Sequence, residues 1–279
     1  MKRFFLITTV VSALLASCGS KHQTKVEEPA TPKFSTFSDH VFSVARQDSI
    51  SVREAAEWVR SVGIEGLDCR TTMTPEMMAA IDSAGLKHAC AILDLSYSKE
   101  PVEEMEEKAL TFCADYGFTR LMYCPTLLPE EGVAPEAMDS ILLHLNAYAE
   151  KANAAGVELL FEDYDNPRSL TFNIAALDKV FAAGPNAKHS YDTGNFFFAG
   201  DDPMAALERF RQRITHVHLK DRMAVGDKAS PIIGTGVVPC REIVNRLMSE
   251  GYDGWFVIAG YGSKDMKEQL EMSVRNLTE

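Results

Sequence analysis

The chain alternates short apolar segments with longer amphipathic segments, and it does so eight times. Parallel strands cannot be joined by tight turns, so each needs a crossover connection, which is usually a helix. Eight such strand–helix units predict a parallel sheet that closes on itself. The expected fold class is therefore α/β, a single-domain (β/α)8 TIM barrel. The predicted strands are Phe34–Phe37, Gly66–Cys69, His88–Leu93, Arg120–Cys124, Val157–Glu162, His189–Asp192, Thr215–Leu219 and Trp255–Ile258.

Start and stop signals mark the helices between these strands. Ser51 and Glu54 have the spacing of a capping box, and Asp202-Pro203 places a capping side chain before a proline at the first helical position. Glycine ends helices well, because it adopts the left-handed backbone conformation at low cost. Five glycines fall where a helix should end before the next strand: Gly63, Gly85, Gly117, Gly156 and Gly184.

The first residues are typical of a processing signal rather than of folded structure. Lys2-Arg3 precedes an apolar stretch, Phe4–Ala16, that is too short for a stable membrane span. Leu15-Ala16-Ser17-Cys18 resembles the lipobox of bacterial lipoproteins, which predicts a signal peptide over residues 1–17 and lipidation of Cys18. An ordinary secretory signal cleaved nearby, with an incidental cysteine, is the alternative.

Residues 18–33 lack apolar periodicity, so they predict a flexible tether, and the barrel is expected over residues 34–279. Lipid alone would then hold the protein at the membrane. Gly19-Ser20, with no acidic residue directly after the cysteine, favours the cell envelope, at the outer membrane facing the periplasm. The formal net charge of −12 argues against nucleic acid and anionic lipid headgroups as partners.

The cysteines of the predicted barrel do not form a recognisable framework. None of them has the paired spacing of a zinc site, and their odd number argues against a complete set of disulfides. Buried free thiols are the favoured interpretation, because most of these residues lie in apolar runs. A bridge from Cys69 to Cys90 or Cys124 is the alternative. The five residues are Cys69, Cys90, Cys113, Cys124 and Cys240.

Acidic and imidazole side chains end several of the predicted strands. The carboxyl ends of parallel barrel strands meet at one mouth, where active sites are built. Glu162, Asp192 and His218 are therefore expected to lie close together, and their oxygen and nitrogen donors suit a divalent metal ion. Asp68 and Asp94 also end strands, but helix or turn capping explains them equally well. A fourth donor is expected at the end of the last strand, where the chain has Ala259.

The seventh predicted strand shows how its side chains are oriented. Alternate residues of a strand point to opposite faces, so His216, His218 and Lys220 share one face. The residues between them are apolar and belong against the helices, so this face is expected to point into the barrel. His218 then lies near the mouth and His216 one layer deeper, as a hydrogen-bonded core residue or a substrate contact. Lys220 is expected to contact the substrate.

Four motifs in order resemble the xylose-isomerase-like family of metal-dependent barrels, which includes sugar and sugar-phosphate isomerases and epimerases. The likeness covers essentially residues 34–279. The motifs are Phe161-Glu162-Asp163, Tyr191-Asp192-Thr193-Gly194-Asn195, His216-Val217-His218-Leu219-Lys220-Asp221, and Ile233-Gly234-Thr235-Gly236 leading to Gly251-Tyr252-Asp253-Gly254.

The resemblance implies one divalent cation (manganese, magnesium, cobalt or zinc) bound by a Glu, an Asp, a His and a second Glu. The first three correspond to Glu162, Asp192 and His218, and the second Glu corresponds to Ala259. Family members often have a His where this chain has Asn195, which can still hydrogen-bond a sugar hydroxyl. The chain thus resembles such an enzyme with one ligand removed, so metal binding is expected to be weak or lost.

Three functions are compatible with this degenerate site. The first is a metal-dependent sugar isomerase or epimerase in which Glu162 removes a proton next to a carbonyl group. The second is a lyase or dehydratase acting on a keto sugar, for which one base suffices. The third is a non-catalytic carbohydrate-binding barrel. Lys220 and Tyr261 are candidates to replace the missing group, and Asn195, His216, Asp68 and Tyr261 are the expected substrate-binding residues.

The segment Gly234-Thr235-Gly236 follows the seventh strand, in a region where barrels often hold phosphate. A flexible connection explains this segment equally well. Export makes phosphorylated sugars less plausible substrates, since metabolic phosphoesters are mainly cytoplasmic. The expected ligand is therefore a small-molecule carbohydrate.

Overall fold

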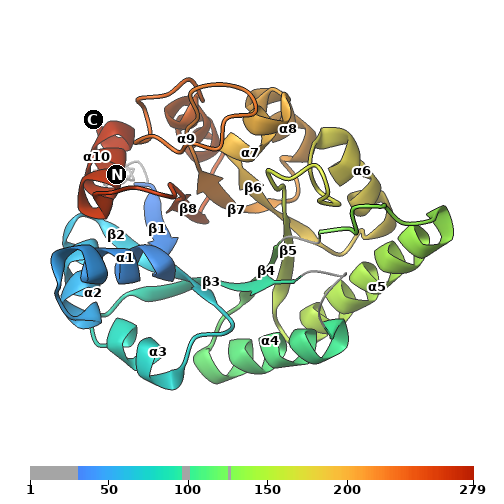
Figure 1. Cartoon of the computed structure of the whole chain (residues 1–279), viewed down its shortest axis with the longest axis horizontal. Helices are drawn as coiled ribbons and strands as arrows, with labels where there is room; N and C mark the ends of the chain where they lie inside the picture. Colours follow the sequence, from blue (N-terminus) through green and yellow to red (C-terminus); the bar gives the residue numbers. More distant parts are fainter. Residues whose placement is uncertain (1–30, 96–100, 125–126) are drawn as a thin grey trace, which may run out of the picture. The chain divides into compact units, whose positions relative to one another are not determined.

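The computed structural model describes residues 31–95, 101–124 and 127–279, and these contain eight parallel strands that close into a barrel. Each strand pairs with its neighbours in sequence, and the first pairs with the last (Figure 1). The predicted (β/α)8 barrel is confirmed. The strands are β1 (Lys33–Phe37), β2 (Ile64–Arg70), β3 (Lys87–Asp94), β4 (Arg120–Cys124), β5 (Glu158–Glu162), β6 (Lys188–Asp192), β7 (Ile214–Leu219) and β8 (Trp255–Ile258).

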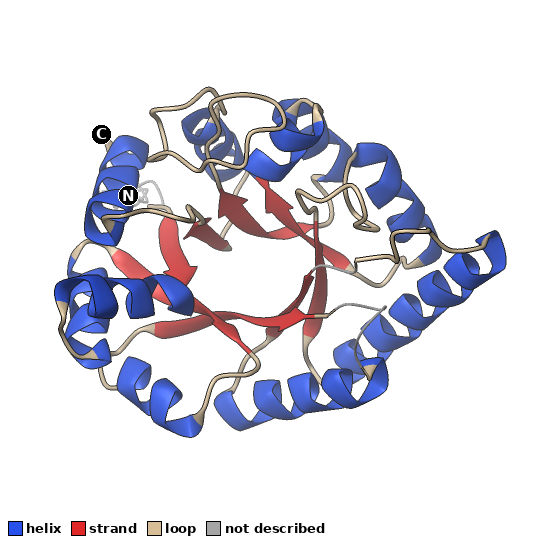
Figure 2. Ribbon diagram, in the orientation of Figure 1, coloured by secondary structure: helices blue, strands red, loops and turns tan. Residues whose placement is uncertain are grey.

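The helices form a ring around the strands (Figure 2). Two helices rather than one follow β1 and β6, and the first of each pair begins directly after its strand. The helices are α1 (Ser38–Asp48), α2 (Val52–Ser61), α3 (Pro75–Asp82), α4 (Val102–Tyr116), α5 (Pro135–Ala154), α6 (Ile174–Ala183), α7 (Thr193–Ala199), α8 (Pro203–Phe210), α9 (Cys240–Ser249) and α10 (Met266–Thr278).

The predicted helix signals act as expected. Ser51 and Glu54 form the capping box at the start of α2, and Asp202 caps α8 through the backbone N–H of Met204. Four of the five glycines that end helices have φ between +70° and +90°, where a side chain would be strained. The fifth, Gly184, ends α6 with φ −119°, so any residue could adopt its backbone conformation.

The barrel begins slightly earlier than predicted. Lys33 pairs with Trp255 of β8, so β1 starts one residue before the expected boundary at residue 34. The predicted signal peptide (1–17), Cys18 and the tether up to residue 30 lie outside the described residues. Within the described part of the chain, no helix is both long and apolar enough to cross a membrane.

The interior of the barrel has an apolar side and a polar side. Strands β3, β4, β5 and β8, with the end of β1, contribute inward-facing apolar residues that form a small cluster separate from the main core. Strands β2, β6 and β7 instead contribute Asp68, Ser190, His216 and His218, all fully buried. Val217 and Leu219 belong to the main core between strands and helices, as the period of β7 predicts.

Cys69, Cys90, Cys113 and Cys240 are buried free thiols, which agrees with the favoured interpretation of the sequence. The bridge between Cys69 and Cys90 is not formed, and the side chain of Cys124 lies outside the described part of the structure. Burial raises the pKa of the Cys113 thiol to about 12, so this thiol is protonated at neutral pH.

The connection between β7 and α9 is organised by one carboxylate, Asp221. Its Oδ1 accepts hydrogen bonds from the backbone N–H groups of Arg222 and Val238, and its Oδ2 accepts them from Gly234 and Gly236. A Cβ atom at residue 236 would lie 2.4 Å from the carbonyl oxygen of Arg222, so only glycine fits there. The N–H groups that a phosphate would need are therefore already bonded to Asp221. The structure favours the interpretation of residues 234–236 as a connecting loop over that of a phosphate site.

We expect Asp221→Asn to destabilise the protein, because the amide presents an NH2 group to backbone donors that now bind a carboxylate. The expected loss is about 2 kcal/mol in the free energy of unfolding, measured by urea denaturation. Asp227→Asn is the matched control, because Asp227 lies in the same connection and accepts one exposed N–H, from Ala229. The control should stay within about 0.5 kcal/mol of wild type. Equal stability of the two variants would contradict the role of Asp221.

Candidate active site

A pocket of about 330 Å³ opens among the carboxyl ends of the strands. Its charged side includes Glu162 at the end of β5 and Lys220 directly after β7. Its apolar lining includes Phe37, Ile92 and Met122, which belong to the inner apolar cluster of the barrel. This position is the one at which barrels of this architecture build active sites.

The three predicted metal ligands converge behind the charged side. Glu162, Asp192 and His218 place one donor atom each within 4.8 Å of one another. His218 Nδ1 lies 2.7 Å from Glu162 Oε1 and 4.0 Å from Asp192 Oδ2. Only Glu162, which is 5% exposed, lines the pocket, because Asp192 and His218 are completely buried.

Asp192 is held by the helix that follows it. Its Oδ1 accepts the backbone N–H groups of Gly194 and Asn195 at 2.9 Å, which makes Asp192 the N-cap of α7. Its Oδ2 lies 2.7 Å from Nζ of Lys220. Both oxygens of this buried carboxylate are therefore engaged inside the protein.

Lys220 is almost buried, at 7% exposed, yet it lines the pocket. Its Nζ donates to Asn195 Oδ1 at 2.9 Å as well as pairing with Asp192. Burial opposes the charge of this lysine, but the nearby carboxylates of Asp192 and Glu162 outweigh that effect and raise its pKa. The lysine is thus an ammonium ion beside Glu162 on the charged side of the pocket.

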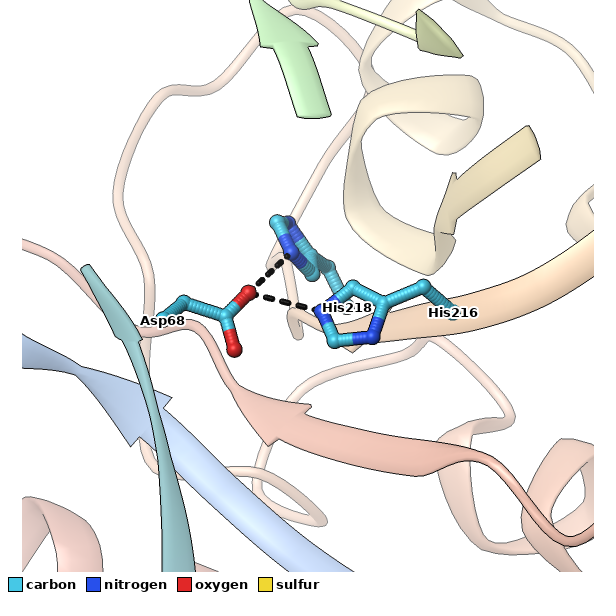
Figure 3. A group of neighbouring side chains, drawn as sticks. All are labelled: Asp68, His216 and His218. Atoms are coloured by element: carbon cyan, nitrogen blue, oxygen red, sulfur yellow. Dashed lines mark hydrogen bonds and ion pairs between the residues drawn. The ribbon is translucent and has the colours of Figure 1, made fainter. Parts of the chain in front are cut away.

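His218 also belongs to a second group of buried side chains, with Asp68 and His216 (Figure 3). Asp68 of β2 accepts hydrogen bonds on Oδ2 from His216 Nε2 at 2.7 Å and from His218 Nε2 at 3.3 Å. Ser35 donates to the other oxygen of Asp68 at 3.3 Å. Asp68, His216 and His218 also form a group close enough to hold a metal ion, although none of the three lines the pocket.

His218 therefore lies between two carboxylates, Glu162 at Nδ1 and Asp68 at Nε2. Burial opposes its charge, but the attraction of Glu162 and the hydrogen bonds to both carboxylates prevail and raise the pKa of His218 to about 10. Burial lowers the pKa of His189, which has no such pair of carboxylates, to about 3. His218 is accordingly charged at neutral pH, and His189 is neutral.

This difference predicts how stability depends on pH. His218 loses its proton near pH 6.5 when unfolded and near pH 10 when folded, so its contribution is complete below about 6.5 and lost as the pH rises through about 10. We expect the free energy of unfolding to fall more steeply over this window in wild type than in His218→Gln. His189→Gln, which removes a neutral histidine, should keep the wild-type slope. Urea denaturation at several pH values measures all three, and a His218→Gln slope equal to wild type would contradict the assignment.

The predicted substrate-binding residues fall into two groups. Tyr261, 44% exposed, lines the pocket and packs against Phe37 with ring centroids 5.2 Å apart. Asp68, Asn195 and His216 are fully buried behind the pocket lining. The side-chain amide of Asn195 donates to the backbone oxygen of Asp163 at 2.7 Å and accepts from Lys220, so it positions neighbouring groups.

Four charged residues of the pocket lining were not predicted from the sequence: Arg70, Asp165, Arg222 and Lys228. Arg222 is buried, lines the pocket, and donates from Nη2 to Asp165 Oδ2 at 2.7 Å. Its position two residues after Lys220 continues the alternation of β7, so extending that period past the strand would have found it. Asp94, which the sequence left open, pairs with Arg70, and both line the pocket.

The residues present do not fit a complete four-donor metal centre. The fourth position holds Ala259, which is completely buried among apolar neighbours such as Phe37 and Val257. One of the remaining carboxylates, Asp192, already faces the ammonium group of Lys220. Two carboxylates and an imidazole remain a group that could hold a metal ion, but one donor is missing and one is paired with a cation.

Comparison with known proteins finds relatives of this chain. Residues 52–278 match a protein family described as the xylose isomerase-like TIM barrel. Inosose dehydratase of Geobacillus thermodenitrificans is 28% identical over 141 residues, which cover 44% of this chain and 47% of that protein. The match therefore spans about half the length of this curated relative.

Solved structures with the same fold include a probable dehydratase, an epimerase and a protein with a bound zinc atom. A probable 3-DHS dehydratase, AsbF of Bacillus anthracis, has a TM-score of 0.73 at 16% identity, covering 88% of this chain and 99% of that one. The 3-keto-D-glucoside 4-epimerase YcjR of E. coli has a TM-score of 0.68 at 16% identity, with coverages of 88% and 99%. An IOLI protein with a bound zinc atom has a TM-score of 0.66 at 14% identity, with coverages of 88% and 95%.

Proposed function

Because this chain belongs to the xylose isomerase-like TIM barrel family, we propose that it is an enzyme that removes a proton from the carbon next to a carbonyl group of a small carbohydrate. The single observation that carries the proposal is the pair of side chains on the charged side of the pocket. Glu162 supplies a carboxylate and Lys220 supplies an ammonium group beside it. The similarity to dehydratases and an epimerase supports an enzymatic role.

Glu162 acts as the base in this proposal. Its Oε1 is fixed by His218 Nδ1, so the carboxylate keeps one orientation toward the pocket. Lys220 donates a hydrogen bond to the carbonyl oxygen of the substrate and stabilises the negative charge that develops there when the proton leaves. Both groups are nearly excluded from water, which strengthens each of these interactions.

The reaction that this geometry supports best is elimination from a keto sugar. Glu162 takes the proton, and the electron pair of the C–H bond forms an enolate. The enolate then forms a C=C bond as the neighbouring C–O bond breaks, and the proton on Glu162 leaves with the departing hydroxyl group as water. One base on one face suffices, in agreement with Ala259 at the position where the resemblance implies a second Glu.

Isomerisation or epimerisation, the function that the sequence favours, is the second candidate. Epimerisation needs a proton donor on the opposite face of the substrate. Tyr261 lines the pocket and packs against the rings of Phe37 and His40. In the second candidate, its hydroxyl group supplies this proton. Deuterium taken up from D2O at the reacting carbon of the recovered sugar would identify this reaction, whereas loss of water from the sugar would identify elimination.

We expect Glu162→Gln to lower kcat by about 10²- to 10⁴-fold, because the amide cannot accept the proton. The measurement uses mass spectrometry to detect dehydration, and deuterium uptake from D2O, with inosose and a 3-keto-glucoside as probes. Glu106→Gln is the matched control, because Glu106 is a buried carboxylate 3.0 Å from His144 Nε2 and does not line the pocket. The control should keep wild-type turnover.

Two outcomes would contradict this assignment. Wild-type turnover in Glu162→Gln would remove Glu162 from the reaction. Binding of the probes without any turnover or deuterium uptake in the wild-type protein would instead support the carbohydrate-binding barrel.

We also propose that the barrel is held at the cell envelope by lipid on Cys18, after removal of residues 1–17. The lipobox-like segment Leu15-Ala16-Ser17-Cys18 supports this proposal. Cys18→Ala should move the protein from the membrane pellet to the soluble fraction of expressing bacteria. Cys240→Ala, which alters a buried thiol of the barrel, should leave the protein in the pellet. An unchanged location of Cys18→Ala would contradict lipid anchoring.

A further inference from the structure

We propose that the ammonium group of Lys220 is the resident cation of this site and replaces the divalent metal ion that a complete four-donor centre would hold. The proposal extends the proposed function, on which its catalytic consequence rests, by naming the cation that faces the substrate. Its structural part stands on the contacts of the lysine alone.

The first argument is the engagement of Asp192. Nζ of Lys220 lies 2.7 Å from Asp192 Oδ2, and the other oxygen of Asp192 accepts two backbone N–H groups of α7. A metal ion bound to Oδ2 would have to displace the ammonium group, and two cations at that distance repel each other strongly in a buried site. The lysine and a metal ion therefore compete for one oxygen.

The second argument is the balance of charge. A centre with three carboxylates, a neutral imidazole and a divalent ion carries a net charge of about −1 by formal counting. This chain lacks one carboxylate at Ala259, and each of the two that remain has a nitrogen partner at 2.7 Å without a metal, Lys220 Nζ for Asp192 and His218 Nδ1 for Glu162. Since buried charges need partners, the loss of the carboxylate and the position of the lysine compensate each other.

The third argument is that the chain is built to hold this lysine in place. The Thr193 hydroxyl accepts the backbone N–H of Lys220 at 2.9 Å and donates to its backbone oxygen at 2.8 Å. At Gly194 a Cβ atom would lie 2.9 Å from Cβ and Cγ of Lys220, so the absence of a side chain there lets the lysine run past α7. The side-chain oxygen of Asn195 accepts a hydrogen bond from Lys220 Nζ and so fixes the end of the lysine side chain.

The test measures Mn²⁺ binding to the full chain by isothermal titration calorimetry, without any substrate. Wild type should bind no stoichiometric Mn²⁺, and excess Mn²⁺ should leave its melting temperature unchanged. Lys220→Met should bind one Mn²⁺ at least tenfold more tightly than wild type, and Lys220→Met with Ala259→Glu should bind it more tightly still. Lys228→Met is the matched control, since Lys228 lines the same pocket but forms its ion pair with Asp165 rather than Asp192. This control should bind Mn²⁺ no more tightly than wild type.

Stability provides a second readout for the variant. Lys220→Met leaves the Asp192 carboxylate buried without its cation, so its melting temperature should fall below that of wild type and rise again when Mn²⁺ is added. A Lys220→Met protein that folds only with Mn²⁺ would also support the proposal. If Lys220→Met folds neither with nor without Mn²⁺, the Mn²⁺ titration of the wild-type protein alone tests the proposal.

Two results would overturn the proposal: one equivalent of Mn²⁺ bound by wild type, or equal Mn²⁺ affinity in Lys220→Met and wild type. Neither result would affect the assignment of Glu162 as base, which is read from turnover of the keto-sugar probes. Failure of the proposed function would in turn leave the Mn²⁺ titrations unchanged, so the two failures are distinguishable.

Discussion

The pairing of buried charge beneath the pocket is the constraint on which the rest of the site depends. Asp192 is fully buried and pairs with Lys220, while Glu162 pairs with His218, and His218 in turn bonds Asp68. An unpaired ion at any of these positions would cost several kcal/mol, so each residue fixes its neighbour. The charged side of the pocket is thus the exposed edge of a connected network rather than a set of independent side chains.

This network determines which groups reach the substrate. His218 and Asp192 are occupied in holding Glu162 and Lys220, and only the latter two line the pocket. The apolar residues Phe37, Ile92 and Met122 also line the pocket, together with the ion pair of Arg70 and Asp94. In the proposed reaction a carbohydrate meets a base and an ammonium group beside each other, Glu162 and Lys220, and Ala259 supplies no second carboxylate.

Much of the fold was predictable, because its signals are local. Eight apolar runs, a capping box and glycines at helix ends gave the order of strands and helices, and the barrel follows from that order. The convergence of Glu162, Asp192 and His218 was predictable for a related reason, since parallel strands end at one mouth. The start of β1 at Lys33 was not predicted, because Lys33 pairs with Trp255, which is more than 200 residues away in the sequence.

The contacts across the barrel were not predictable from the sequence. Asp68 lies on β2 and His216 on β7, which are not neighbours in the sheet, and the closed barrel brings the two side chains to 2.7 Å. Strand alternation also could not show that Asp192 is covered, because that depends on α7 starting directly after β6. The role of Gly234 and Gly236 was not predictable either, because it depends on the hydrogen bonds that their backbone N–H groups donate to Asp221.

The most direct measurement of the central claim is a crystal structure of the wild-type chain with a bound keto sugar, grown with Mn²⁺ in the solution. The account predicts the sugar carbonyl oxygen within hydrogen-bond distance of Lys220 Nζ, the reacting carbon facing Glu162, and no anomalous metal signal between Glu162 and Asp192. A carbonyl oxygen bound to a metal ion there, with Lys220 turned away from Asp192, would contradict it.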